Sequence, residues 1–127
     1  MQKILLMLIV GCGGFIGASL RYIISINSAK TFGVEFPYGT LIANIIGAII
    51  IGLIMELSLN TNLVSSNTRL FLTTGMMGGL TTFSTFSFET ISMIMNGSIL
   101  LGSLNIILNL GLSLFGVCIG QFIARLV

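Results

Sequence analysis

Four long apolar stretches are the sequence feature that most constrains how this chain can fold. Only 6% of the residues are charged, five Lys or Arg and three Asp or Glu, and the mean hydropathy is +1.15. A water-soluble domain usually has about a quarter charged residues, so a surface this poor in charge would not stay hydrated. A membrane-spanning helix needs about 20 apolar residues, and the chain has room for four. We therefore predict an all-α membrane protein with four transmembrane helices, at about residues 4–25, 38–57, 69–95 and 99–127.

The continuous apolar runs argue against other architectures. Strands of a transmembrane barrel alternate apolar and polar residues with a period of two, and these runs do not. The first run could also be a signal peptide, because Lys3 precedes it and Ala18 and Ser19 are small residues near a cleavage point. It is longer than the usual signal-peptide apolar region, so we interpret it as the first span. Residues 1–127 are expected to form a single transmembrane domain without internal repeats.

The composition excludes several classes of function. The net charge is +2 and the basic residues are scattered, so neither a nucleic-acid partner nor a polybasic lipid site is indicated. No glycine-rich phosphate loop followed by Lys and Ser or Thr is present, so no nucleotide is expected. The sequence has no His, no Ser/His/Asp set, no metal-ligand cluster and no paired carboxylates. We predict that the protein is not an enzyme.

Basic residues are almost evenly divided between the two sides that four spans define. One side would carry Lys3, Arg69 and Arg125, and the other Arg21 and Lys30. An excess of Lys and Arg normally sets the orientation, and three against two is almost no excess. Such a chain could insert both ways, and two opposed copies could then pair in an inverted-topology architecture. Alternatively, other determinants fix one orientation, and the charge count leaves both interpretations open.

Small residues recur at four-residue spacing, for example in Gly13/Gly17 and Gly75/Gly79. They allow helix backbones to approach closely, which favours association within lipid. We expect a tightly packed assembly.

The segment least suited to lipid follows the paired glycines of the third span. Six of the ten residues from Thr81 to Thr90 carry hydroxyl groups, three are Phe and one is Glu. Gly78 and Gly79 before this run favour a helix interrupted at membrane depth, which must be buried in protein or face water or an ion. Its freed carbonyls would suit a desolvated cation. The alternative is an unbroken helix whose hydroxyls bond to the preceding turn.

Aromatic and acidic side chains follow the predicted break. Phe83 and Phe86 are three residues apart and share a helix face. The positive edge of a phenyl ring attracts an anion weakly, although two Phe at this spacing are more often core packing. Glu89 could be an ion-pathway residue or lie at the interfacial end of the span.

Polar stripes mark the second and fourth spans. Asn105, Asn109 and Ser113 follow one another at four-residue spacing on one helix face, and Thr40 and Asn44 share that spacing. Neutral amides and hydroxyls donate hydrogen bonds without a fixed charge, which suits a path that a small anion must enter and leave. The same groups often bond between helices, so each could be structural. Together with the Phe segment, we predict that they line a pathway.

Three strings in the sequence resemble the fluoride channels of the Fluc (CrcB) family. They occupy residues 13–22 (GGFIGASLRY), 39–44 (GTLIAN) and 78–89 (GGLTTFSTFSFE). The resemblance covers all four spans. It implies an antiparallel, dual-topology homodimer with two pores, which passes fluoride passively and excludes chloride. It also implies a structural sodium ion and a location in a prokaryotic plasma or inner membrane.

The resemblance implies roles for individual residues. Phe83 and Phe86 would turn their ring edges toward fluoride, and Asn44 would be the pore-lining amide. Backbone carbonyls of Gly78 and Thr81, from both subunits, would hold the sodium ion.

Other polar residues would lie near the pathway or its entrance. The expected pathway residues are Thr40, Ser84, Asn109 and Ser113, and the expected vestibule or packing residues are Arg21 and Glu89. Asn105 and Asn109 depart from some family members, which have tyrosine and serine at these positions.

We interpret the chain as a dimeric fluoride channel whose partners are fluoride, sodium, a second copy and the lipid bilayer. The alternative is a small proton-coupled multidrug transporter, although the first span lacks the acidic residue expected midway along it. A non-transporting membrane assembly factor is a third interpretation.

Overall fold

The computed structural model describes residues 1–126 and consists of helices joined by short connections. Three of them, α1 (Gln2–Phe32), α2 (Tyr38–Asn60) and α6 (Ile99–Ala124), are long and apolar enough to cross a membrane. The third pass through the bundle is a broken helix made of four consecutive segments: α3 (Ser66–Leu70), the π-helical η1 (Phe71–Met77), α4 (Gly78–Leu80) and α5 (Phe83–Met95). Residues 1–126 contain no strand, and the broken third helix is present, so both predictions are confirmed.

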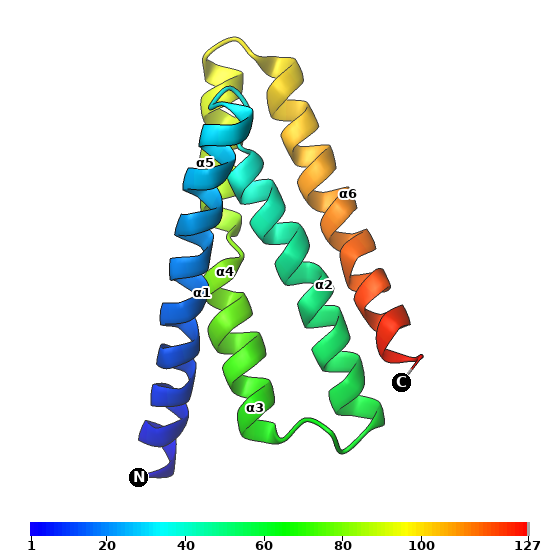
Figure 1. Ribbon diagram of the computed structural model, residues 1–127. Coiled ribbons are helices and arrows are strands. Elements are labelled where there is room, and N and C mark those ends of the chain that lie inside the picture. The colour runs from blue at the N-terminus through cyan, green and yellow to red at the C-terminus, as the bar shows by residue number, and fades with distance from the viewer. Residues whose placement is uncertain (127) are drawn as a thin grey trace.

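The chain passes four times along the bundle. Both termini and the α2–α3 connection lie at one end, and the α1–α2 and α5–α6 connections lie at the other (Figure 1). Arg21, which we expected on the side of Lys30, instead reaches the Thr81 carbonyl at the level of the break. The reason is that α1 continues to Phe32, well beyond its predicted end near residue 25.

The extra length of α1 follows from where the first helix-ending residue occurs. Asn27 to Phe32 contains neither Gly nor Pro, and the helix ends at Gly33. Gly33 has a φ of 85°, which favours glycine, and its N–H donates to the Ala29 carbonyl oxygen at 3.1 Å. The predicted end near residue 25 is therefore the end of the apolar run, whereas the helix itself continues to Phe32.

Glycines bring the α1 backbone directly against the broken helix. A Cβ atom on Gly13 would lie 2.5 Å from the Phe71 carbonyl oxygen, and one on Gly17 would overlap the Met76 carbonyl oxygen. Gly79 faces α1 in the same way, with the Gly14 oxygen 2.5 Å from its hypothetical Cβ. The predicted close packing of small residues is therefore confirmed between these helices.

Helices α2 and α6 pack together most extensively, and a charged pair joins their ends. Gly52 and Gly120 allow the two backbones to approach. Near the end that carries the C-terminus, Arg125 Nε lies 2.7 Å from Glu56 Oε1, and Asn60 Nδ2 donates to the same oxygen at 2.9 Å. Large apolar side chains elsewhere are widely exposed, as expected of surfaces that contact lipid or another protein.

Candidate functional site

The helix break consists of two residues with extended backbone. Thr81 has φ −78° and ψ 156°, and Thr82 has φ −153° and ψ 122°. The Thr82 hydroxyl accepts from the Thr85 backbone N–H at 3.2 Å and so caps the start of α5. Hydroxyls also bond to preceding turns, as the unbroken-helix alternative expected, for example from Thr81 to the Met77 carbonyl at 2.9 Å. The break and these local bonds therefore coexist.

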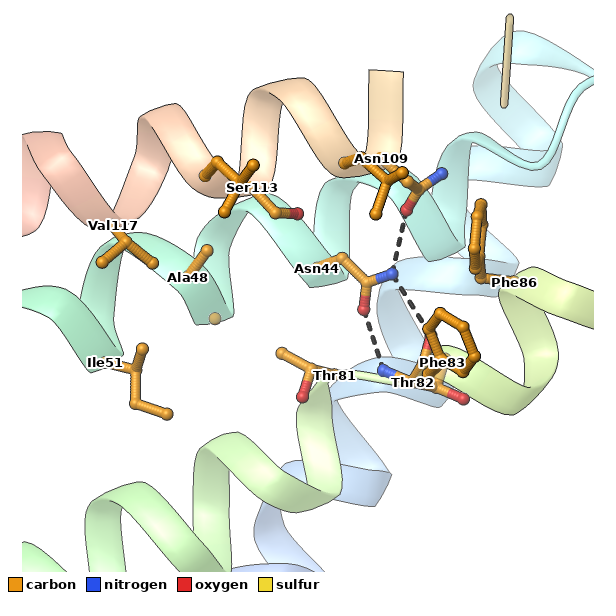
Figure 2. A pocket seen from close by; sticks show the side chains of 13 residues that line it. Asn44, Ala48, Ile51, Thr81, Thr82, Phe83, Phe86, Asn109, Ser113 and Val117 are labelled. Atoms are coloured by element: carbon orange, nitrogen blue, oxygen red, sulfur yellow. Dashed lines mark hydrogen bonds between the residues drawn. The ribbon is translucent and has the colours of Figure 1, made fainter. Parts of the chain in front are cut away.

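Asn44 of α2 satisfies the backbone groups that the break frees. The Thr82 N–H donates to Asn44 Oδ1 at 2.8 Å, and Asn44 Nδ2 donates to the Thr82 carbonyl oxygen at 3.2 Å (Figure 2). The side-chain amide thus pairs with both polar groups of one residue. This pairing meets the requirement that non-helical backbone at membrane depth be buried in protein.

A chain of amide hydrogen bonds continues from Asn44 into the bundle. Asn44 Nδ2 donates to Asn109 Oδ1 at 2.9 Å, and Asn109 Nδ2 donates to Asn105 Oδ1 at 2.8 Å. Asn105 Nδ2 then donates to the Thr90 hydroxyl at 2.9 Å, and that hydroxyl donates to the Phe86 carbonyl at 2.8 Å. The two predicted stripes therefore meet, and their amides bond between helices as the structural alternative proposed.

Burial decreases along this chain toward a groove. Asn105 is completely buried, Asn109 is 4% exposed, and Asn44 is partly exposed. Asn44 and Asn109 line a groove of about 360 Å³ (Figure 2). Its other polar lining residues are Thr81, Thr82 and Ser113. Among the described residues, none that lines this groove is charged.

The two predicted phenylalanines lie together at this groove but in different surroundings. The ring centroids of Phe83 and Phe86 are 5.5 Å apart, and the rings are inclined by 52°. Phe86 is 7% exposed, whereas Phe83 is 75% exposed. Phe86 thus packs inside the helix bundle, and Phe83 presents its ring at the surface of this chain.

Thr40 and Glu89 form a second polar contact, apart from the groove. Thr40 donates from its hydroxyl to Glu89 Oε1 at 2.8 Å. Both residues line a smaller pocket of about 190 Å³ below the α1–α2 connection, together with Ser25 and Tyr38. Glu89 Oε2 is buried and has no hydrogen-bond partner among the described residues. This carboxyl is therefore a polar group still in need of a water molecule, a proton or another donor.

The carbonyls predicted to hold sodium lie at the break. Because the Thr82 N–H donates to Asn44, the Gly78 carbonyl loses the N–H that an unbroken helix would supply. The Thr81 carbonyl accepts one long hydrogen bond, at 3.5 Å, from Arg21 Nη1. Two backbone oxygens with spare acceptor capacity fit a hard cation, which prefers oxygen ligands. No group of three or more His, Cys, Asp or Glu that could bind a metal occurs in residues 1–126.

Of the remaining predicted residues, Ser84 lies at the break and Ser113 lies across the groove on α6, and two contributors were missed. Ser84 Oγ is 3.4 Å from the Thr82 hydroxyl, and Ser113 lines the groove. Thr82 and Thr90, which pair with Asn44 and Asn105, were not predicted as site residues. A Thr before a helix whose first turn is polar could have identified Thr82 as an N-cap. Nothing in the sequence pairs Thr90 with Asn105.

Comparisons with known proteins identify the family of this chain. A family model described as CrcB-like protein, camphor resistance (CrcB), matches residues 8–121. The chain belongs to the CrcB family. A relative from Clostridium perfringens (strain ATCC 13124) named fluoride-specific ion channel FluC is 71% identical over 126 residues, covering 99% of this chain and 98% of the relative.

More distant members carry the same name. The FluC protein of Clostridium novyi is 65% identical over 127 residues, which cover 100% of this chain and 99% of that protein. The protein of Roseiflexus sp. is 42% identical over 116 residues, covering 91% and 94% respectively. The family resemblance read from the three strings is thereby confirmed, and the chain is a multi-pass membrane protein of this family.

Proposed function

We propose that the protein is a fluoride-selective channel that exports fluoride passively and thereby lowers its toxicity, and that it is not an enzyme. The observation that supports this most directly is the groove at the helix break, where amide, hydroxyl and aromatic groups converge among aliphatic side chains and no charged residue of 1–126 lines the groove. Its close relatives are named fluoride-specific ion channels, which supports the same function.

Neutral donors suit a strongly hydrated anion. Dehydration of fluoride is expensive, so the path must offer replacement donors such as Asn44, Ser84 and Ser113. Thr40, whose hydroxyl donates to Glu89 in the smaller pocket, would lie farther along the same path. The edges of Phe83 and Phe86 add weakly positive surfaces. A fixed positive charge in the path would hold the ion too firmly for rapid release, whereas dipoles allow it to leave. Asn109, which lines the same groove as Asn44, would also interact with the ion there.

We further propose that two copies in opposite orientations form the channel, with two pores. Basic residues are few at both ends of the bundle, with Lys3, Arg69 and Arg125 at one end and Lys30 at the other, so the small excess permits both orientations. Phe83 supports the proposal because its exposed ring would be available to a pore shared between subunits. Backbone carbonyls of Gly78 and Thr81 from both subunits would coordinate a sodium ion at the centre of the assembly, and the ion would satisfy the oxygens that the break frees. Arg21 and Glu89 would lie near the entrances, and the assembly would lie in a prokaryotic plasma or inner membrane.

Fluoride efflux from vesicles tests the function. Purified protein is reconstituted in liposomes loaded with potassium fluoride, and a potassium ionophore compensates the charge. We expect rapid fluoride release, no chloride release and no requirement for a proton gradient. Flux that needs a proton gradient and an organic cation would instead identify a multidrug transporter. The absence of any flux from vesicles that contain folded protein would contradict the proposal and leave an assembly factor.

A further inference from the structure

The orientation of the Asn44 amide is fixed by the backbone of the break. Its Oδ1 faces the Thr82 N–H at 2.8 Å, and its Nδ2 faces the Thr82 carbonyl at 3.2 Å. Turning this amide over would oppose two donors and two acceptors, so the amide cannot reverse. The second hydrogen on Asn44 Nδ2 therefore always points toward Asn109.

Beyond Asn44, by contrast, the series of hydrogen bonds through Asn109, Asn105 and Thr90, here called the amide chain, can reverse its donor-to-acceptor direction. Asn109 and Asn105 are neutral amides with a donor at one end and an acceptor at the other. The chain ends at Thr90, whose hydroxyl accepts from Asn105 at 2.9 Å and donates to the Phe86 carbonyl at 2.8 Å. By rotation about its C–O bond, this hydroxyl can instead donate to Asn105, and it then gives up its bond to the Phe86 carbonyl. None of these three side chains is held in one direction by a charge.

In the observed orientation, Asn44 has no N–H available for an anion. Both of its Nδ2 hydrogens are used, by the Thr82 carbonyl and by Asn109 Oδ1. An anion in the groove would also meet the Asn109 oxygen, which repels it. Asn109 Nδ2 is turned away and donates to Asn105 Oδ1 at 2.8 Å and to the Asn105 carbonyl at 3.1 Å.

We propose that fluoride binds where Asn44 and Asn109 meet at the groove, and that its binding reverses the direction of the amide chain beyond Asn44. Because Asn44 Nδ2 and Asn109 Oδ1 are 2.9 Å apart, the two side chains separate to admit the ion. This proposal rests on the proposed channel function. With the ion bound, N–H groups of Asn44 and Asn109 both donate to it. Asn109 Oδ1 then accepts from Asn105 Nδ2, and Asn105 Oδ1 accepts from the Thr90 hydroxyl. Every amide oxygen and hydroxyl oxygen keeps a partner in both orientations.

The two orientations differ in a way that suits conduction. Reversal gives up the bond from Asn109 to the Asn105 carbonyl and the bond from Thr90 to the Phe86 carbonyl. It gains N–H bonds to an anion, which are stronger than bonds between neutral groups. Without fluoride, the amide chain favours the observed direction. Its return to that direction removes the N–H groups from the ion and so releases it. Binding strong enough for entry but weak enough for release is what a channel requires.

Asn105 is a positioning residue in this scheme. It is completely buried and does not line the groove, so it acts on the ion only through Asn109. Its role separates chain reversal from simple binding at Asn44. A response of Asn105 to fluoride is therefore the decisive observation.

The test uses the unaltered chain in lipid nanodiscs, with ¹⁵N in the Asn side chains. Fluoride replaces chloride at constant ionic strength while the amide resonances are recorded. We expect the Nδ2 resonances of Asn44 and Asn105 to shift with one shared half-saturation concentration. Asn96, in the turn between α5 and α6, is the control and should not shift. A shift at Asn44 without one at Asn105 would overturn the reversal, as would shifts at neither residue in protein that conducts fluoride.

Flux measurements on variants provide a second readout. Asn105→Leu removes the amide at similar size and should raise the half-saturating fluoride concentration about tenfold, the effect of one hydrogen bond, while the saturating flux changes little. Ser103→Ala, on the same helix but outside the amide chain, should change neither the half-saturating fluoride concentration nor the saturating flux. A fall in saturating flux alone would indicate a merely structural role. Loss of all fluoride flux in the unaltered protein, by contrast, would refute the channel function itself.

Discussion

The two sides of the broken helix are held by different chemistry. Toward α1, backbone packs on backbone at glycines such as Gly13 and Gly17, and the polar contact from Arg21 is long, at 3.5 Å. Toward α2 and α6, the contact is a continuous chain of amides and hydroxyls that includes Asn44 and Asn105. The first interface depends on volume, and the second depends on matched donors and acceptors. Substitutions should therefore affect assembly on one side and ion passage on the other.

The largest expected effect tests the glycine interface. Gly17→Val should prevent folding, because its Cβ would overlap the Met76 carbonyl oxygen and neither backbone can move freely. Overpacking typically costs about 1–3 kcal/mol and occasionally more, and an overlap between two backbones is at the upper end of this range. Recovery of monodisperse protein by size-exclusion chromatography is the measurement. Gly11→Val is the matched control, since a Cβ on Gly11 meets nothing within 4 Å. Equal recovery of both variants would contradict the importance of this contact.

The next effect concerns the aromatic pair on the polar side. Phe83→Ile or Phe86→Ile should abolish fluoride flux and leave the assembly intact, because an aliphatic side chain lacks the positive ring edge. Phe86→Ile should also lower thermal stability, since Phe86 is 7% exposed and Phe83 is 75% exposed. Liposome flux and thermal unfolding of each variant give the comparison. Undiminished flux in either variant would remove that ring from the pathway.

A charge at the head of the amide chain should have a smaller effect that depends on pH. Asn44→Asp places a carboxylate where two N–H donors face the Thr82 carbonyl and Asn109 Oδ1. We expect fluoride flux at neutral pH to fall about tenfold or more, from repulsion and from unpaired acceptors. Acidification should restore part of the flux, because the protonated carboxyl is neutral and can donate. Asn96→Asp in the α5–α6 turn serves as the control, and unchanged rates in Asn44→Asp would remove Asn44 from the pathway.

The smallest effect is expected at the end of the bundle, where the only charged pair among the described residues lies outside both interfaces. The Arg125 side chain is 66% exposed and the Glu56 side chain is 11% exposed, so water and salt reach the pair from the Arg125 side and weaken it. Glu56→Gln should therefore lower the thermal unfolding midpoint only slightly and leave fluoride flux unchanged. Thermal unfolding at low and high salt measures this contribution. A loss of flux would show that the end of α2 is coupled to the groove.

Residue spacing predicted much of the candidate site because helical periodicity places i and i+4 on one face. It identified the stripes of Thr40 and Asn44 and of Asn105 and Asn109 before any partner was known. It could not tell whether the stripes faced each other, since that depends on the rotation and crossing of separate helices. Thr82 and Thr90 were missed for the same reason. Their role comes from the side chains that oppose them on α2 and α6.

The sequence by itself determined that the chain is helical, crosses a membrane several times and breaks its third helix. These properties follow from local composition: apolar length, scarce charge, and paired glycines before a run of hydroxyl residues. Only the tertiary structure decided which donor meets which acceptor. Asn44 pairs with the Thr82 backbone because α2 lies against the break, and Asn109 receives the remaining hydrogen because α6 lies against α2. The direction of the amide chain arises from contacts between residues up to 65 positions apart, which no local pattern encodes.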